Sequence, residues 1–335
     1  MILVNTRDEG GLARYGIQVP VMPKTADLVF EKLAGDIRPG ERPDWMIGRD
    51  QTLPTREDLA RVHDPDYVAR ILDPYTRDDE LKQAFELIAE DGSYHRYDPS
   101  QAEVPLGHLL DHLLDIAGGS IQCMRRAMLG GFCFFLGGGM HHAMFDYGSG
   151  FCLINDVVIG IRALQATGTI RTAWVIDTDA HKGDGTAALT ADDESIVTLS
   201  MHMGDSWPLT ESRTLADGRA NPSFIDSNVE IPVYDGEEAQ YMKKLSAGLA
   251  ELDRYPRPDL VVVVYGADPY EHDELPSTAT LRLTLEQMAE RDALVWDFIQ
   301  DRGLPVAYLH SGGYGRRAWE PTAQFLRLRT KGTAV

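Results

Sequence analysis

The sequence is poor in cysteine and has no long apolar run. Its 335 residues include only three cysteines, Cys123, Cys133 and Cys152, and no two of them form a CxxC pair. An odd number without paired spacing argues against a disulfide framework and favours a reducing compartment. No apolar run approaches the roughly 20 residues that span a bilayer. Residues 1–14 also lack the charged and then apolar pattern of a secretion signal. We therefore expect a cytoplasmic protein without a membrane partner.

Basic residues are also scarce relative to acidic ones. Lys and Arg total 32 and Asp and Glu total 52, which gives a formal net charge of −20. Such a surface repels phosphates, so we expect no nucleic acid partner. Its long-range field attracts cations such as polyamines and lysine-rich peptides. Solubility alone is an equally good explanation of the acidic surface.

Short apolar runs alternate with amphipathic segments along the chain. This alternation is typical of βαβ units and predicts an α/β fold built on a parallel sheet. The expected buried strands are residues 132–136, 173–176, 196–200, 260–265 and 306–310, and the expected helices include residues 154–166, 238–252 and 281–299. Two long stretches, residues 91–104 and 204–236, are expected to be surface loops. Loops of that length shape a binding site, decorate the surface or contact a second copy in a homo-oligomer.

Four of the predicted strands run directly into a polar cluster at their carboxyl ends. The clusters are Gly137-Gly138-Gly139-Met140-His141-His142, the stretch 177–185, Gly266-Ala267-Asp268 and Ser311-Gly312-Gly313-Tyr314. In open parallel sheets, ligands bind in the crevice beyond the carboxyl ends of the strands. The four clusters are therefore predicted to converge on one site.

The cluster after residue 176 has the composition of a metal site. Asp177, Asp179 and His181 alternate, so they project from the same face while the chain stays extended. Carboxylates crowded at a buried strand end are costly unless a cation neutralises them, although a helix cap or a salt bridge is the simpler alternative. Asp268, from the next cluster, is the natural third ligand. Two carboxylates and one imidazole leave positions open for water and substrate and suit Zn²⁺, while Fe²⁺, Mn²⁺ and Co²⁺ accept the same ligands.

The remaining clusters supply groups that can move protons. His141 and His142 follow three glycines, and one of them can act as a general base if a carboxylate orients its far nitrogen. Asp177 and Asp184 are the available carboxylates. Tyr314 can donate a hydrogen bond to a developing oxyanion, a contribution of about 3 kcal/mol. On its own, this tyrosine would be interpreted as an aromatic residue that caps a turn.

Together these residues resemble the arginase/deacetylase superfamily. The closest resemblance is to the zinc-dependent histone deacetylase family and its bacterial acetylpolyamine amidohydrolase relatives. The similar segments are 137–143, 150–152 with Asn155-Asp156, 177–185, 200–202, 266–268 and 312–314, with a weaker match over 56–72. The resemblance implies one catalytic domain over residues 1–335, with a mostly parallel sheet of about eight strands and helices on both faces.

The resemblance also implies a role for each catalytic residue. His142, paired with Asp184, would be the general base and acid, while His141, paired with Asp177, would act electrostatically. Tyr314 would polarise the amide carbonyl.

The same resemblance implies two ion sites. Asp179, His181 and Asp268 would bind zinc. A structural K⁺ or Na⁺ would bind near Asp177, Asp179, His181, Ser200 and Met201.

A narrow tunnel for a linear alkyl-amine chain is implied as well. Phe151 and Trp207 would wall it, with Gly150 giving clearance, and Asp98 would grip the substrate at the rim. This sequence departs from the family in two places. Lys182 replaces the histidine that usually follows the metal-binding histidine, and the segment 20–25 lacks the arginine often associated with product exit.

These features predict a hydrolase that removes acetyl or other acyl groups from amines. Acyl-lysine in proteins and acetylated polyamines are both open as substrates. One alternative is an arginase-like guanidine hydrolase, which would need two Mn²⁺ ions and further carboxylates in place of the histidine pair and Tyr314. The other is a metal-binding scaffold without catalytic activity.

Overall fold

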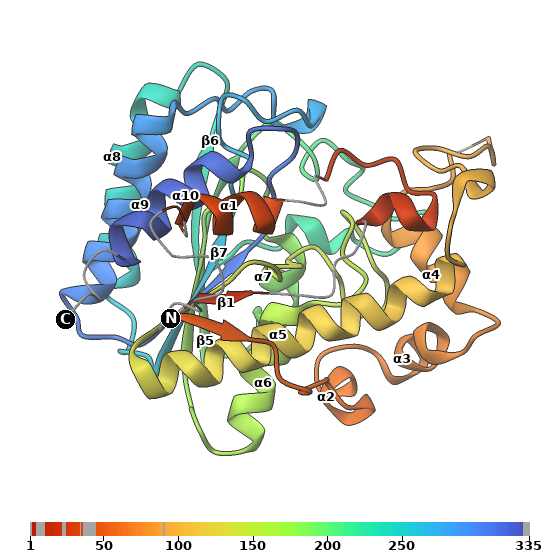
Figure 1. The fold of residues 1–335 in the computed structure, drawn as a ribbon, viewed down its shortest axis with the longest axis horizontal. Coiled ribbons are helices and arrows are strands. Elements are labelled where there is room, and N and C mark those ends of the chain that lie inside the picture. Colours follow the sequence, from red (N-terminus) through yellow and green to blue (C-terminus); the bar gives the residue numbers. More distant parts are fainter. Residues whose placement is uncertain are drawn as a thin grey trace.

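Within the described part of the chain, one sheet of eight strands lies at the centre of the protein (Figure 1). The computed structural model describes residues 2–4, 11–21, 25–33, 35, 45–89 and 91–330. All strand pairings are parallel, in the order β2-β1-β3-β8-β7-β4-β5-β6. The strands are β1 (Ile2–Val4), β2 (Met46–Gly48), β3 (Phe132–Phe135), β4 (Ala173–Asp177), β5 (Ile196–Met203), β6 (Val229–Val233), β7 (Leu260–Tyr265) and β8 (Val306–His310). The predicted parallel α/β fold is confirmed.

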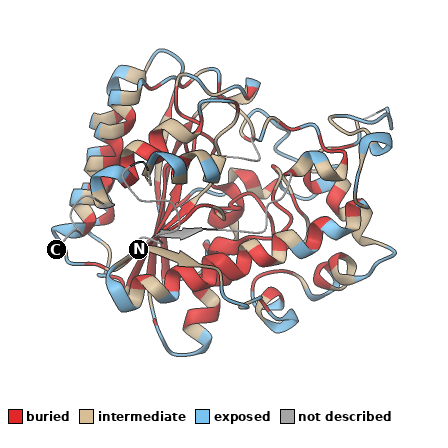
Figure 2. Cartoon of the chain, viewed as in Figure 1, coloured by how far each residue is buried: buried red, intermediate tan, exposed pale blue. Residues whose placement is uncertain are grey.

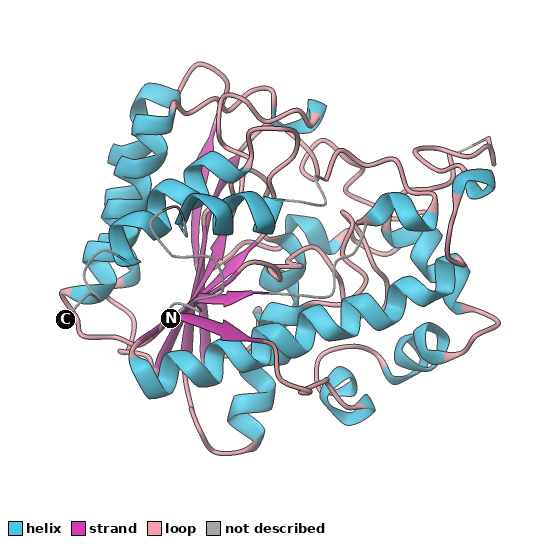
Figure 3. Cartoon of the chain, viewed as in Figure 1, coloured by secondary structure: helices cyan, strands magenta, loops and turns pink. Residues whose placement is uncertain are grey.

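Helices cover both faces of this sheet (Figure 3). They are α1 (Thr25–Leu33), α2 (Arg56–Ala60), α3 (Pro65–Leu72), α4 (Arg77–Ala84), α5 (Leu109–Gly130), α6 (Asp156–Ala166), α7 (Asp184–Thr190), α8 (Tyr241–Leu252), α9 (Leu285–Gln300) and α10 (Trp319–Thr330). Helices α5 and α6 pack into one apolar core, whereas α1, α8, α9 and α10 pack into the other. Within the described ranges, no helix combines the length and apolar character needed to cross a bilayer.

Strands β4, β5 and β7 are buried along their whole length because the sheet is covered on both sides (Figure 2). In β7 the side chains of Leu260, Val262 and Val264 enter the core under α5 and α6. Those of Val261, Val263 and Tyr265 enter the opposite core. This alternation explains why the strand is apolar at every position instead of at every second one.

Some element boundaries differ from those predicted. Helix α9 begins at Leu285 and not at residue 281, because Thr284 forms a capping box with Gln287. Helix α6 begins at Asp156, since the Asn155 side chain accepts a hydrogen bond from the Val158 N–H and caps the helix. The stretch 204–236 is not wholly a loop, because it contains the edge strand β6.

The four polar clusters lie on four consecutive strands at the centre of the sheet, β3, β8, β7 and β4. Main-chain hydrogen bonds join the turns that follow these strands. The N–H of Ala267 donates to the carbonyl of Gly312 at 2.6 Å, and the N–H of His310 donates to Gly137 at 3.1 Å. The Thr178 N–H donates to the carbonyl of Val264 at 3.0 Å. The carboxyl edge of the sheet therefore holds the clusters together, as predicted from the sequence.

A buried arginine supports two of these turns from the side of α9. Arg291 is 0% exposed, and its Nη1 donates to the carbonyl of Gly266 at 2.7 Å and to that of Thr178 at 3.2 Å. Its charge is offset by the carboxylate of Asp292 at 2.8 Å. An ion pair this deeply buried is costly to break, because removing one partner leaves the other charge without compensation.

We expect Arg291→Met to lower the free energy of unfolding by about 3–5 kcal/mol, measured by urea denaturation. Arg302→Met is the matched control, since Arg302 forms a two-point ion pair with Asp253 at the surface. Its loss should be about 1 kcal/mol or less. Equal losses in the two variants would show that Arg291 does not support the turns in this way.

Candidate metal centre and active site

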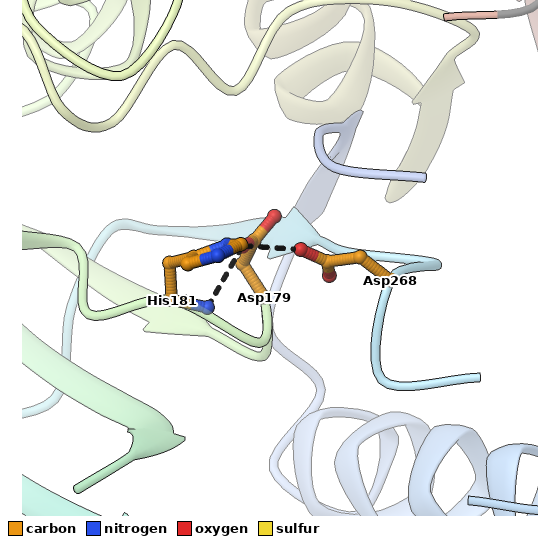
Figure 4. A group of neighbouring side chains, drawn as sticks. All are labelled: Asp179, His181 and Asp268. Atoms are coloured by element: carbon orange, nitrogen blue, oxygen red, sulfur yellow. Dashed lines mark hydrogen bonds and ion pairs between the residues drawn. The ribbon is translucent and has the colours of Figure 1, made fainter. Parts of the chain in front are cut away.

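Three side chains from two turns converge at the carboxyl edge of the sheet (Figure 4). Asp179 and His181 follow β4, and Asp268 follows β7, the neighbouring strand. One ligand atom from each residue lies within 4.8 Å of the others, and all three residues are buried. The Nδ1 of His181 is 3.3 Å from Asp179 Oδ1 and 3.2 Å from Asp268 Oδ2. The structure thus brings together the predicted metal ligands.

The donor atoms fit a divalent cation. The N–H of Ala180 donates to Asp268 Oδ1 at 2.9 Å, while the buried Oδ2 of Asp268 accepts no hydrogen bond from the described residues. A buried carboxylate oxygen without a donor is unfavourable unless a cation approaches it. Gly312 leaves the space open, because a Cβ at this position would lie 2.5 Å from the same oxygen.

Electrostatics in the site also favour a bound cation. Burial, together with the negative charge of Asp179, raises the pKa of Asp268 to about 8. Burial lowers the pKa of His181, but a hydrogen bond to Asp179 and the negative charges of both Asp179 and Asp268 outweigh this effect and raise the pKa to about 10. A bound divalent cation would lower both pKa values, because metal ligands bind in their deprotonated forms.

Two histidine–carboxylate pairs lie beside the candidate metal site. The Nδ1 of His141 is 2.6 Å from Asp177 Oδ2, and the Nδ1 of His142 is 2.7 Å from Asp184 Oδ1. The centroids of the two imidazole rings are 4.0 Å apart. The pairing that the resemblance implied is therefore present.

The two histidines differ in charge. Burial lowers the pKa of His141, but the Asp177 and Asp179 carboxylates outweigh burial and raise it to about 9. For His142, burial and the neighbouring charge of His141 lower the pKa to about 4. At neutral pH, His141 is therefore a cation, whereas His142 is neutral and able to accept a proton.

The phenol of Tyr314 shares a cavity with these groups. The cavity has a volume of about 490 Å³, and its lining includes His141, His142, Asp179 and Tyr314. Burial and the nearby carboxylates hold the pKa of Tyr314 well above its usual range, so the phenol keeps its proton. It remains a hydrogen-bond donor within the same cavity as the histidines.

The predicted tunnel residues are near the site, with one exception. Gly150 and Phe151 line the cavity, and both have left-handed backbones, with φ of 56° and 65°. Trp207 packs edge-on against His142, with ring centroids 4.7 Å apart. Asp98 is not among the cavity-lining residues; its carboxylate accepts hydrogen bonds from Ser100 and Gln101 and caps a short 3-10 turn. Its role at the rim stays a prediction.

The residues predicted to hold a monovalent cation are neighbours. Asp177 of β4 is opposite Ser200 of β5, and Met201 follows in the same strand. Asp177 Oδ1 accepts a hydrogen bond from the N–H of Asp179 at 3.1 Å, which connects this group to the candidate zinc ligands. The monovalent cation itself stays a prediction.

The sequence departs from the family pattern at Lys182 and in the segment 20–25, and the structure shows where parts of both lie. The Lys182 side chain is buried away from the metal group, with its Nζ 2.8 Å from Glu230 of β6. Thr25 lines the cavity, while residues 22–24 of the segment 20–25 lie outside the described residues.

Sequence reasoning missed a group of residues between Asp268 and α9. Asp273 accepts a hydrogen bond from the N–H of Tyr314 at 2.7 Å, and burial raises the pKa of Asp273 to about 6. Ser277 lies 2.9 Å from the Nε2 of His181. These residues have no distinctive spacing or glycine turn, so only their proximity in the fold identifies them.

Comparison with known proteins places this chain in a family. The model of the histone deacetylase domain matches residues 20–326. An uncharacterized protein of Picosynechococcus is 31% identical over 265 residues, which cover 79% of this chain and 77% of that protein. The acetoin utilization protein AcuC of Bacillus subtilis is 27% identical over 277 residues, covering 80% of this chain and 68% of its own length.

Solved structures show the same fold. An acetylpolyamine aminohydrolase from Burkholderia pseudomallei matches with a TM-score of 0.69 at 20% identity and covers 99% of each chain. A histone deacetylase homologue from Aquifex aeolicus matches with a TM-score of 0.70, also at 20% identity, over all of this chain and 85% of the other. The family match over most of the sequence, together with the shared fold, shows that this chain belongs to the histone deacetylase domain family.

Proposed function

We propose that this protein is a metal-dependent amidohydrolase that removes acyl groups, chiefly acetyl, from amines. One observation carries the proposal: a single cavity holds the candidate metal ligand Asp179, the histidines at 141 and 142, and the Tyr314 phenol. Family membership supports the reaction class. Zn²⁺ suits the two carboxylates and one imidazole, and Fe²⁺, Mn²⁺ and Co²⁺ accept the same ligand types.

His142 is the group best placed to move protons. Its low pKa leaves it neutral at pH 7, and its Nδ1 is directed to Asp184, so Nε2 is the free basic nitrogen. It takes a proton from the attacking water and delivers it to the departing amine nitrogen. When bound, the divalent ion would supply Lewis acidity to the carbonyl and to that water.

Two further groups stabilise charge during the reaction. Tyr314 stays protonated and donates a hydrogen bond to the oxygen that becomes negative as the carbonyl is attacked. His141 is a cation held by Asp177, and it contributes positive charge without exchanging its proton. Phe151 and Trp207 exclude water around the alkyl chain of the substrate.

The substrate class is an acylated amine on a linear chain. Acyl-lysine and acetylpolyamines both have this form, and each places a linear methylene chain next to the amide. The net charge of −20 favours substrates that carry a positive charge, because the field of the protein concentrates cations near its surface.

We expect His142→Ala and Tyr314→Phe each to reduce kcat by at least ~100-fold on an acetyl-lysine peptide, while the fold and metal content are retained. The matched controls are His108→Ala and Tyr75→Phe. The His108 side chain is 63% exposed, and Tyr75 is 93% exposed. Near-normal turnover in either site variant would refute the role assigned to that residue.

The dependence of kcat/KM on salt should show whether the negative charge of the protein favours cationic substrates. We expect kcat/KM for N-acetylputrescine to fall at least ~3-fold as NaCl rises from about 20 to about 500 mM, because salt screens its attraction to the acidic protein. N-butylacetamide has the same chain without the ammonium group, and its kcat/KM should change little. If both substrates respond equally, the acidic surface does not select cationic substrates.

A further inference from the structure

A short loop between β7 and α9 contacts the candidate metal ligand His181 on the side of the ring that faces away from Asp179 and Asp268. The loop comprises residues 273–278 and ends in a 3-10 turn, Pro276–Thr278. Within this turn, Ser277 places its Oγ 2.9 Å from the Nε2 of His181. Neither atom belongs to the group of three metal donors.

The opposite nitrogen of the same imidazole faces the carboxylates. His181 Nδ1 lies 3.3 Å from Asp179 Oδ1 and 3.2 Å from Asp268 Oδ2. A cation among these oxygens would be held through the lone pair of Nδ1, and the proton of the neutral ring would then be on Nε2. That N–H would donate to Ser277 Oγ and so would fix both the tautomer and the angle of the ring.

Ser277 is itself held in place by the rest of the loop. Its carbonyl accepts a hydrogen bond from the Ser206 hydroxyl at 2.7 Å. The neighbouring Thr278 hydroxyl donates to Asp273 Oδ1 at 2.9 Å, and Asp273 Oδ2 accepts from the Tyr314 N–H at 2.7 Å. The backbone that carries the Ser277 hydroxyl is therefore held by a network of hydrogen bonds.

We propose that Ser277 is a positioning residue that orients His181 for metal binding. The inference rests on the proposed metal site at Asp179, His181 and Asp268. At one end of the loop Ser277 contacts His181, and at the other end Asp273 accepts a hydrogen bond from the backbone N–H of Tyr314. One short segment thereby sets the relative positions of the metal and of the phenol that faces the substrate carbonyl.

The test is the affinity of the whole protein for Zn²⁺, measured by competition with a chromophoric chelator. We expect Ser277→Ala to raise the Kd for Zn²⁺ by about 10–100-fold, the range typical of lost support for a ligating histidine. Ser277→Thr retains a hydroxyl and should restore most of the affinity. Ser195→Ala is the matched control, because the Ser195 hydroxyl also accepts one side-chain hydrogen bond, from Gln165, but precedes β5 at the opposite edge of the sheet.

Co²⁺ provides a second readout that does not depend on turnover. The visible absorption of the Co²⁺-loaded protein should change in Ser277→Ala, because the ring reorients at the metal, and should return in Ser277→Thr. An unchanged Kd and spectrum in Ser277→Ala would overturn the proposal, as would an equal loss of affinity in Ser277→Thr or Ser195→Ala. If the unmodified protein binds Zn²⁺ but hydrolyses no acylated amine, the proposed function fails while this test still stands.

Discussion

The structure depends on the compensation of negative charge at the carboxyl ends of two neighbouring strands. Asp179 and Asp268 are buried side by side after β4 and β7, where water cannot screen their repulsion. His181 lies between them and offsets part of this cost. A divalent cation would offset the rest, and the oxygen of Asp268 that accepts no hydrogen bond from the described residues is the clearest sign of where it binds.

Much of the surrounding structure serves to hold this unfavourable arrangement in place. The Gly312 N–H donates to Asp179 Oδ2 at 2.9 Å, and the same glycine supplies the space beside Asp268. Arg291 donates hydrogen bonds to the carbonyl of Thr178, which precedes Asp179, and to that of Gly266, two residues before Asp268. The cost of burying these groups is met by two large apolar cores, one on each face of the sheet.

The same local field separates the functions of the adjacent histidines. His141 has two carboxylates within ion-pair distance, Asp177 and Asp179, and retains its charge. His142 has one carboxylate, Asp184, and the positive charge of His141 beside it, so it is neutral. Two identical side chains in sequence thus have pKa values shifted in opposite directions because their neighbours differ, which supports the different roles proposed for them.

The central strands and the grouping of the candidate metal ligands could be predicted from the sequence, because both depend on local patterns. Apolar runs such as 260–265 end directly in the polar clusters, and parallel strands bring those ends together. Asp177 shows the limit of the alternation argument. Strand β4 ends at this residue, so alternation does not continue beyond it, and Asp177 pairs with His141 instead of joining the metal group.

Features that depend on tertiary contacts could not be predicted in this way. Strand β6 contains Pro232 and lies within a long polar stretch, and its pairing with β5 is what makes it a strand. Ser277 and Asp273 have ordinary sequence surroundings, so their contacts with His181 and Tyr314 become apparent only in three dimensions.

The most direct test of the central claim is a crystal structure of the zinc-loaded protein with anomalous diffraction data collected at the zinc absorption edge. The account predicts one strong peak bound by the carboxylates at 179 and 268 and by Nδ1 of His181, at metal–ligand distances of about 2.0–2.2 Å. Zinc bound elsewhere with these three side chains left unliganded, or a second equally occupied metal position in the cavity, would contradict it.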